Sequence, residues 1–218
     1  MADIFQEVDE EVRREKLQQI WNRHGGLIVT LCVLVVVGVA AWRGWQWYQT
    51  QQATKASAAF DAATQLVLQS KPDEAAKAFA DLSKSAETAN YRRLAQLREA
   101  AVLETTDPKA AVAAYDAIVA DGAAPKLFRD VAAVRAGLLL VDTAPYAEVS
   151  RRLEPLAAPG LPFRHSAREA LALSAWKAGD TAAARRWAEA ATNDADVPAG
   201  LKARVEILLA LTGGNAKT

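Results

Sequence analysis

The chain has 218 residues, with 26 basic and 26 acidic side chains and a formal net charge of zero. This balance excludes the basic footprint expected of a nucleic-acid-binding protein. The single cysteine, Cys32, excludes an intramolecular disulfide, so packing must stabilise the fold.

Residues 1–24 carry acidic and basic side chains together with two short apolar stripes at helical spacing. Because chain ends usually lack fixed order, we interpret this segment as a partly ordered tail. The alternative is a small contact site for a regulatory protein. The stripes consist of Phe5, Val8 and Val12, and of Leu17, Ile20 and Trp21.

Residues 25–48 read GGLIVTLCVLVVVGVAAWRGWQWY and are predicted to form a transmembrane helix. The uncharged run from Leu27 to Trp42 would rise about 24 Å as a helix, and its flanks extend it towards the roughly 30 Å of a bilayer core. A soluble amphipathic helix would require a polar face, and this run has none. Aromatic rings suited to the headgroup level stand at both ends, namely Trp21 before the run and Trp42, Trp45, Trp47 and Tyr48 at its end.

Two alternatives to a permanent anchor are a buried core helix and a cleaved signal peptide. The uniformly apolar surface opposes the first. Val39-Ala40-Ala41 resembles a signal cleavage site, but a signal begins with a short basic region, whereas residues 1–24 are long and rich in acidic side chains. We therefore expect the helix to be retained.

The distribution of basic residues predicts the orientation of this anchor. Four basic residues precede the span, whereas Arg43 and Lys55 are the only ones near its other end. Since the positive flank stays in the cytoplasm, residues 1–24 are expected inside and residues 49–218 outside. In a Gram-negative bacterium the outside compartment is the periplasm. The four preceding residues are Arg13, Arg14, Lys16 and Arg23.

Residues 49–218 are predicted to be all-α. The region is rich in alanine, shows no strand-like alternation, and is divided by Pro and Gly into helical lengths of about 12 to 18 residues. Asp73, Asp107 and Asp180 precede predicted helices and are expected to cap them.

A repeat with a period near 34 residues runs through this region. The segments PDEAAKAFADL, DPKAAVAAYDAI and GDTAAARRWAEA share a small residue, an aromatic residue four positions later, and a small or apolar residue three positions after that. PYAEVSRRLEPL repeats the spacing with leucine as the central residue. The period is typical of tetratricopeptide helix pairs. The central residues, at intervals of 36, 38 and 34, are Phe79, Tyr115, Leu153 and Trp187.

The repeat predicts an α-solenoid of about four helix pairs with a C-terminal capping helix at 199–212. The three aromatic residues are expected to be buried between helices. The alternative is an ordinary alanine-rich bundle with accidental spacing. The first helices of the pairs are predicted at 50–69, 88–104, 126–142 and 163–178.

The first helices of stacked pairs usually line the inner surface of a solenoid. Polar and aromatic side chains on these helices are therefore candidates for contact with partners. They are Tyr91, Arg92, Arg93, Arg98, Arg129, Arg135, Arg164, Arg168, Trp176 and Lys177.

No pattern in the sequence indicates catalysis. The two histidines, His24 and His165, are predicted on opposite sides of the membrane, which excludes a two-histidine metal site in one protomer. His165 is expected at the surface of a helix start, and Cys32 as an apolar filler in the span. Glycine-rich nucleotide loops and nucleophile motifs are absent from the sequence. We predict a non-enzyme without catalytic, cofactor-binding or metal-binding residues and without a cofactor.

The order of these parts resembles the ancillary SecYEG translocon subunit family. The segment MADIFQEVDEEVRREKLQQIWNRHGG leads into one span, an RGWQWYQTQQ juncture follows, and alanine-rich degenerate repeats complete the chain. The resemblance covers the whole chain and implies a single-pass bacterial inner-membrane protein with a periplasmic repeat domain. It also implies association with the SecYEG translocon and a membrane-anchored periplasmic chaperone. No individual binding residue is carried over.

The favoured interpretation is a membrane-tethered protein-interaction scaffold that assists the handling of exported proteins. The alternative is a structural or regulatory envelope protein that self-associates through its membrane helix and repeat domain. Neither interpretation fixes an oligomeric state. We expect contact with the lipid bilayer and with proteins, but not with nucleic acid.

Overall fold

The computed structural model describes residues 2–213, with side chains described for Arg14, Gln18 and residues 21–213. The regular secondary structure within residues 2–213 consists only of helices, which are joined by short turns and loops. The all-α prediction is therefore confirmed for this range. The chain divides into two compact units, Met1–Gln52 and Ala53–Thr218. Both apolar stripes of the tail, except Trp21, lie outside the described side chains.

Helix α1, Ala2–Leu68, contains the predicted anchor. Its segment Trp21–Leu68 is long and apolar enough to cross a membrane, with a mean hydropathy of 2.5 over the most apolar stretch. The apolar side chains of that stretch are left uncovered by the protein, as Val36 with 66% exposure illustrates. The hydroxyl of Thr30 donates to the Gly26 carbonyl oxygen at 2.8 Å, so the helix itself satisfies it. These properties fit a lipid-facing helix.

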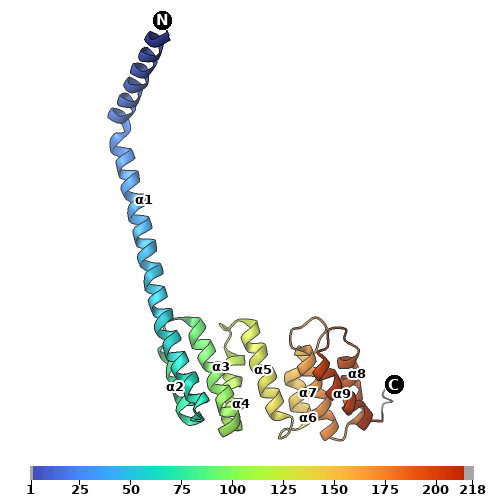
Figure 1. The fold of residues 1–218 in the computed structure, drawn as a ribbon. Coiled ribbons are helices and arrows are strands. Elements are labelled where there is room, and N and C mark those ends of the chain that lie inside the picture. The colour runs from blue at the N-terminus through green and yellow to red at the C-terminus, as the bar shows by residue number, and fades with distance from the viewer. Residues whose placement is uncertain (1, 214–218) are drawn as a thin grey trace. The chain divides into compact units, whose positions relative to one another are not determined.

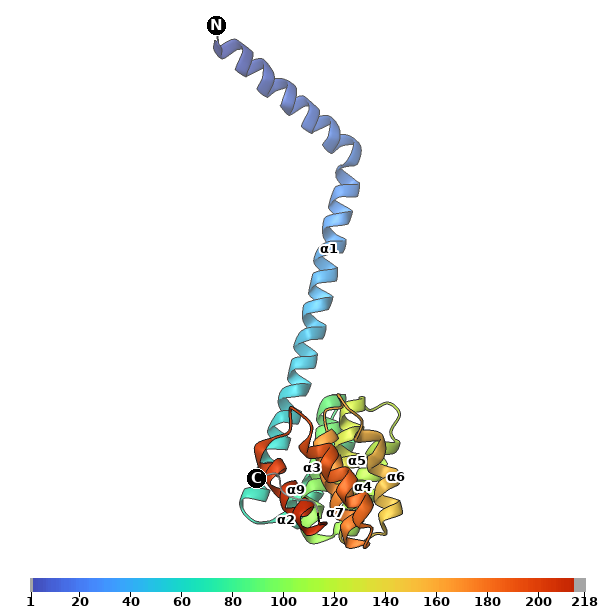
Figure 2. The ribbon, with the colours of Figure 1, turned by 90° about the vertical axis from the view of Figure 1, so that its right-hand side faces the viewer.

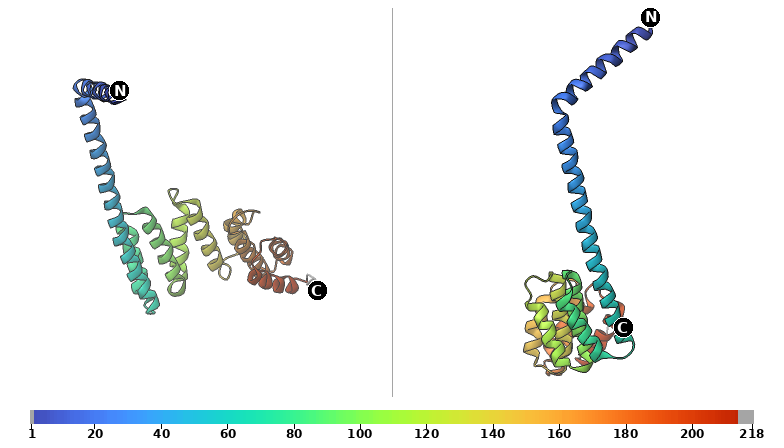
Figure 3. Two further views of the ribbon diagram at one scale, coloured as in Figure 1. Left: turned by 45° about the horizontal axis from the view of Figure 1, so that its top comes forward. Right: turned by 90° about the vertical axis from the view of Figure 1, so that its left-hand side faces the viewer.

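The second unit is a stack of helices that follow one another in chain order (Figure 1). Figure 2 looks along this stack from the end where α9 lies, and Figure 3 shows its colour progression from two further sides. After the last turns of α1 come α2 Pro72–Ser85, α3 Ala89–Thr106, α4 Pro108–Ala120, α5 Lys126–Leu140, α6 Tyr146–Leu153 with the short 3-10 helix η1 Glu154–Leu156, α7 Arg164–Lys177, α8 Thr181–Thr192 and α9 Ala199–Leu211.

The predicted helix pairs are confirmed, and the boundaries of α3, α5 and α7 differ from the predicted ones by only a few residues. The prediction of a separate first helix that begins at residue 50 is wrong, because α1 continues without a break from the anchor to Leu68. The segment QTQQATK after Tyr48 contains neither proline nor glycine to end the helix.

Phe79 and Tyr115 are each 1% exposed, and Leu153 is fully buried, as expected for residues that fill the space between helices. Trp187 is only half-buried, because the single helix α9 follows α8 in the stack. Its indole Nε1 donates to the Tyr146 hydroxyl at 3.0 Å, which gives the polar edge of the ring a partner.

Two of the three predicted helix caps are confirmed. Asp107 accepts a hydrogen bond from the Ala110 amide at 3.0 Å, and Asp180 accepts one from Ala183 at 2.9 Å. The prediction for Asp73 is wrong, because Pro72 is the first residue of α2 and Lys71 is its N-cap. Proline is well suited to the first helical position. The negative charge of Asp73 then lies in the first turn, where it interacts favourably with the helix dipole.

The degenerate third unit is held by a close approach between α5 and α6. Gly137 lies in α5 opposite the buried side chain of Leu153. A Cβ atom at position 137 would stand 2.6 Å from Leu153 Cδ2 and 2.7 Å from its Cγ. In this unit leucine replaces the aromatic residue, and the facing helix carries glycine. The Leu153 side chain occupies the space that a side chain at position 137 would need, so the two residues depend on each other.

Candidate functional site

An aliphatic residue recurs at the equivalent position of four successive first helices. Val67 in α1, Val102 in α3, Leu138 in α5 and Leu173 in α7 are separated by 35, 36 and 35 residues. Val67 and Leu138 remain 43% and 39% exposed, and the other two are half-buried. We call these four residues the aliphatic stripe. Exposed apolar side chains in register on stacked helices are a candidate contact surface for a protein.

Two hollows open along the aliphatic stripe. The first has a volume of about 740 Å³ and contains Val67 and Val102 in its wall. The second, of about 410 Å³, lies between α5 and α7. Its wall consists of Leu138, Val141, Asp142, Leu173, Trp176 and Lys177. Both hollows therefore pair stripe residues from two neighbouring first helices.

Two ion pairs connect first helices to one another, and a third connects α7 to the capping helix α9. Arg135 of α5 donates from Nε and Nη2 to the two carboxylate oxygens of Glu104 in α3, at 2.9 and 3.0 Å. Lys177 of α7 pairs with Asp142 at the end of α5, and Arg204 of α9 pairs with Glu169 of α7. Exposed pairs of this kind each contribute about 0–1 kcal/mol, so their main effect is to neutralise charge along the face.

Tyr115 connects the second helix of its pair to the first of these ion pairs. Its hydroxyl donates to Glu104 Oε1 at 2.6 Å, from a ring that is almost completely buried. Burial, followed by this hydrogen bond, raises the pKa of Tyr115 to about 12. The phenol therefore keeps its proton at any physiological pH and remains a hydrogen-bond donor to Glu104. Glu104 is thus fixed from two sides, by Tyr115 and by Arg135.

The predicted inner-surface residues divide into two groups. Arg98, Arg135, Trp176 and Lys177 do line the hollows. Most of the others pack against neighbouring side chains or bind loop carbonyl and carboxylate groups. Arg129 is different, because its Nε is buried without a hydrogen-bond partner among the described residues. In this second group Tyr91 stacks edge-on against Phe60, Arg92 donates to the Ala86 and Glu87 carbonyls, and Arg93 donates to the Ala123 carbonyl.

Arg164 and Arg168 belong to a clamp around Asp194, in the loop between α8 and α9. Arg164 Nε and Arg168 Nη1 donate to Asp194 Oδ2 at 2.7 and 2.8 Å, and Arg168 is only 5% exposed. The hydrogen bond from Arg164 is the main cause that holds the Asp194 pKa well below its usual range. The prediction that Arg168 faces a partner is therefore wrong. The prediction of a surface position for His165 is also wrong, because this residue is 8% exposed beside the clamp.

Among the described residues, no three or more His, Cys, Asp or Glu side chains lie close enough together to hold a metal ion. Cys32 is free and lies exposed on the anchor helix. The absence of catalytic and cofactor-binding residues stays a prediction. The aliphatic stripe was missed by sequence reasoning, although its signal, an aliphatic residue every 35 or 36 positions, is present in the chain.

Comparisons with known proteins agree with this architecture. The chain is 36% identical over 70 residues to the ancillary SecYEG translocon subunit of Haemophilus influenzae, which supports the resemblance seen in the sequence. The match spans 32% of this chain and only about a third, 33%, of that relative. No solved structure matches the chain. The model of the tetratricopeptide repeat-like domain family matches residues 18–209, so the chain belongs to this family.

Proposed function

We propose that the protein is a non-enzymatic, membrane-tethered interaction scaffold that acts as an ancillary factor at a Sec translocon. The tetratricopeptide repeat-like domain points to protein partners, and the Haemophilus relative, an ancillary SecYEG translocon subunit, points to the translocon. The observation that carries the proposal is the aliphatic stripe with its two open hollows. In this role the repeat domain contacts exported proteins and a membrane-anchored chaperone on the periplasmic side.

The proposed division of labour has three parts. Residues 1–24 lie in the cytoplasm, residues 25–48 cross the inner membrane, and residues 49–218 form the periplasmic repeat domain. A tether to the same membrane raises the effective concentration of partners to around the millimolar range. Weak contacts along the aliphatic stripe are then sufficient for function, which fits a surface that is only partly apolar.

Cross-linking in intact cells tests the scaffold directly. A photoreactive residue at Leu138, 39% exposed on the stripe, is expected to capture a translocon subunit or a membrane-anchored chaperone. Val119 in α4 is the matched control, because it is aliphatic, 38% exposed and on a second helix. The same capture from Val119 would contradict a role for the stripe. Capture of only a second copy of this chain from Leu138 would support self-association instead.

A reporter enzyme that is active only outside the cytoplasm tests the orientation. Fused after Thr218 it is expected to be active, and inserted near residue 3 it is expected to be inactive, because basic residues concentrate before the span. Enzyme activity from cells that carry each fusion, normalised to its amount in membranes, gives the answer. A stable, membrane-inserted C-terminal fusion without activity would refute the orientation.

A further inference from the structure

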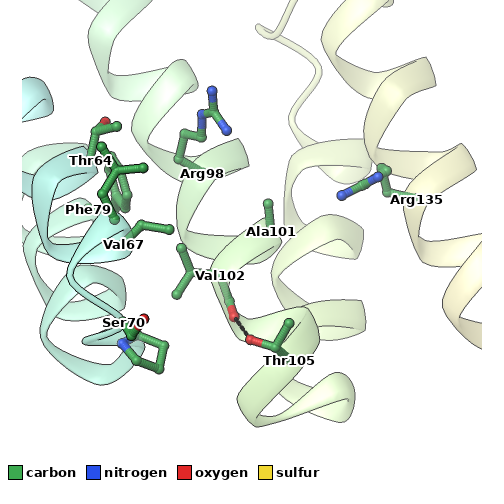
Figure 4. Close-up of a pocket in the computed structure, with 11 residues that line it drawn as sticks. Thr64, Val67, Ser70, Phe79, Arg98, Ala101, Val102, Thr105 and Arg135 are labelled. Carbon is green, nitrogen blue, oxygen red and sulfur yellow. Dashed lines mark hydrogen bonds between the residues drawn. The ribbon is translucent and has the colours of Figure 1, made fainter.

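The first hollow has an apolar floor that is open to solvent. Figure 4 shows the side chains of Val67 and Val102 pointing towards one another, with Phe79 between Thr64 and Val67. Val67 is 43% exposed, so the protein itself does not cover this floor. The volume of about 740 Å³ is larger than one side chain and fits a short stretch of peptide.

The charge around this floor is positive. Its wall includes Arg98 and Arg135 but no acidic residue. Arg135 extends towards α3 in Figure 4 and is neutralised there by Glu104. Arg98 makes no hydrogen bond and no ion pair within the part of the chain that the structure describes. One uncompensated guanidinium therefore stands beside an uncovered apolar floor.

The second hollow has no unpaired cation in its wall. Its cation, Lys177, is paired with Asp142, and both residues belong to the wall. The two hollows share the aliphatic stripe but differ in net charge. A preference for negative charge should therefore be confined to the hollow beside Arg98.

We infer that the first hollow binds a short, extended, acidic segment of a protein partner. One aliphatic or aromatic side chain of the segment fills the space between Val67 and Val102, and a neighbouring carboxylate pairs with Arg98. Guanidinium and carboxylate form charge-assisted hydrogen bonds, which are about twice as strong as neutral ones. The inference rests on the proposed scaffold function and specifies the chemistry of one of its contacts.

Peptide binding to the full-length chain in nanodiscs of zwitterionic lipid tests this inference. The probe is a fluorescein-labelled peptide with a central leucine between two aspartates, followed by fluorescence anisotropy. Asparagine in place of both aspartates is expected to weaken binding about tenfold, as is serine in place of the leucine. Arg98→Gln should weaken the aspartate peptide about tenfold and leave the asparagine peptide unaffected. Arg98→Lys should retain part of the affinity.

Two further variants separate a direct contact from a change in fold. Arg185→Gln removes an exposed arginine of α8 that pairs with Glu189, and it should leave peptide affinity unchanged. Val67→Trp should fill the hollow and abolish binding while the helical circular dichroism spectrum stays the same. Equal binding of the aspartate peptide by Arg98→Gln, or no binding by the unmodified chain, would overturn the inference.

The outcome is distinguishable from failure of the proposed function. If Leu138 captures a translocon partner in cells but the acidic peptide does not bind, only the inference about the first hollow fails. If anionic lipid vesicles bind at Arg98 and the peptide does not, the hollow recognises lipid and the inference is likewise overturned. Loss of both peptide binding and cross-linking would refute the scaffold itself.

Discussion

Tyr115→Ala is expected to lower the free energy of unfolding of the repeat domain by about 3–5 kcal/mol, the range for emptying a buried aromatic site. The ring is 1% exposed and packs with Ala100 of α3 and with Ala132 and Ala136 of α5. Removing it leaves a cavity that these helices cannot close, and it also removes the hydroxyl bonded to Glu104. Chemical denaturation of the full-length protein in detergent, followed by far-ultraviolet circular dichroism, measures the loss.

Tyr115→Phe separates the two contributions. It keeps the ring and removes only the hydrogen bond to Glu104, so a loss of about 1 kcal/mol is expected. The Glu104 carboxylate keeps both contacts with Arg135 and does not become an unpaired buried charge. Equal losses for the alanine and phenylalanine variants would show that the ring contributes nothing, contrary to its burial.

Gly137→Ala is expected to destabilise the domain by about 1–3 kcal/mol, although alanine normally favours a helix by about 1 kcal/mol over glycine. The new methyl group would approach three side-chain atoms of Leu153 to between 2.6 and 2.8 Å. Leu153 is completely buried and cannot move aside without displacing its neighbours. The same denaturation measurement applies. Gly200→Ala in α9 is the matched control within a helix, because the nearest atom to the added Cβ there is the flexible Arg204 Nη1 at 4.0 Å.

A Leu153→Ala background should reverse the sign of this effect. The leucine truncation alone costs about 2–5 kcal/mol and leaves a cavity facing α5. In that background the methyl group of Gly137→Ala enters the cavity, so it should restore part of the lost stability. Simple additivity of the two substitutions would contradict a direct contact between positions 137 and 153.

The helices and their pairing could be predicted from the sequence because both depend on local signals. Proline and glycine mark the turns, and the period of small and aromatic residues identifies the helix that faces its partner. Phe79 and Tyr115 were placed correctly because each is followed by further repeats that cover it. The caps at Asp107 and Asp180 likewise depend only on residues within one turn.

The remaining errors concern contacts between distant residues. Arg168 looks like an exposed helix residue until the loop that holds Asp194, 26 positions away, folds over it. The burial of His165 follows from the same loop. The incomplete cover of Trp187 reflects its place near the end of the stack, which a local motif does not encode. Within the candidate site, Arg98 and Trp176 were identified, but the apolar floor between Val67 and Val102 was not.

The aliphatic stripe also constrains the conformation of a chain that crosses it. Helices in direct contact lie about 8–10 Å apart. Since α3 contacts α5 and α5 contacts α7, stripe residues on these first helices recur at about that distance. A polyproline II helix turns once every three residues and rises about 3.1 Å per residue, so one of its faces recurs every ~9 Å. A partner with an apolar side chain at every third position, in that conformation, would meet Val67, Val102, Leu138 and Leu173 in turn. A β-strand, whose side chains alternate with a period of two, would fall out of step after the second helix.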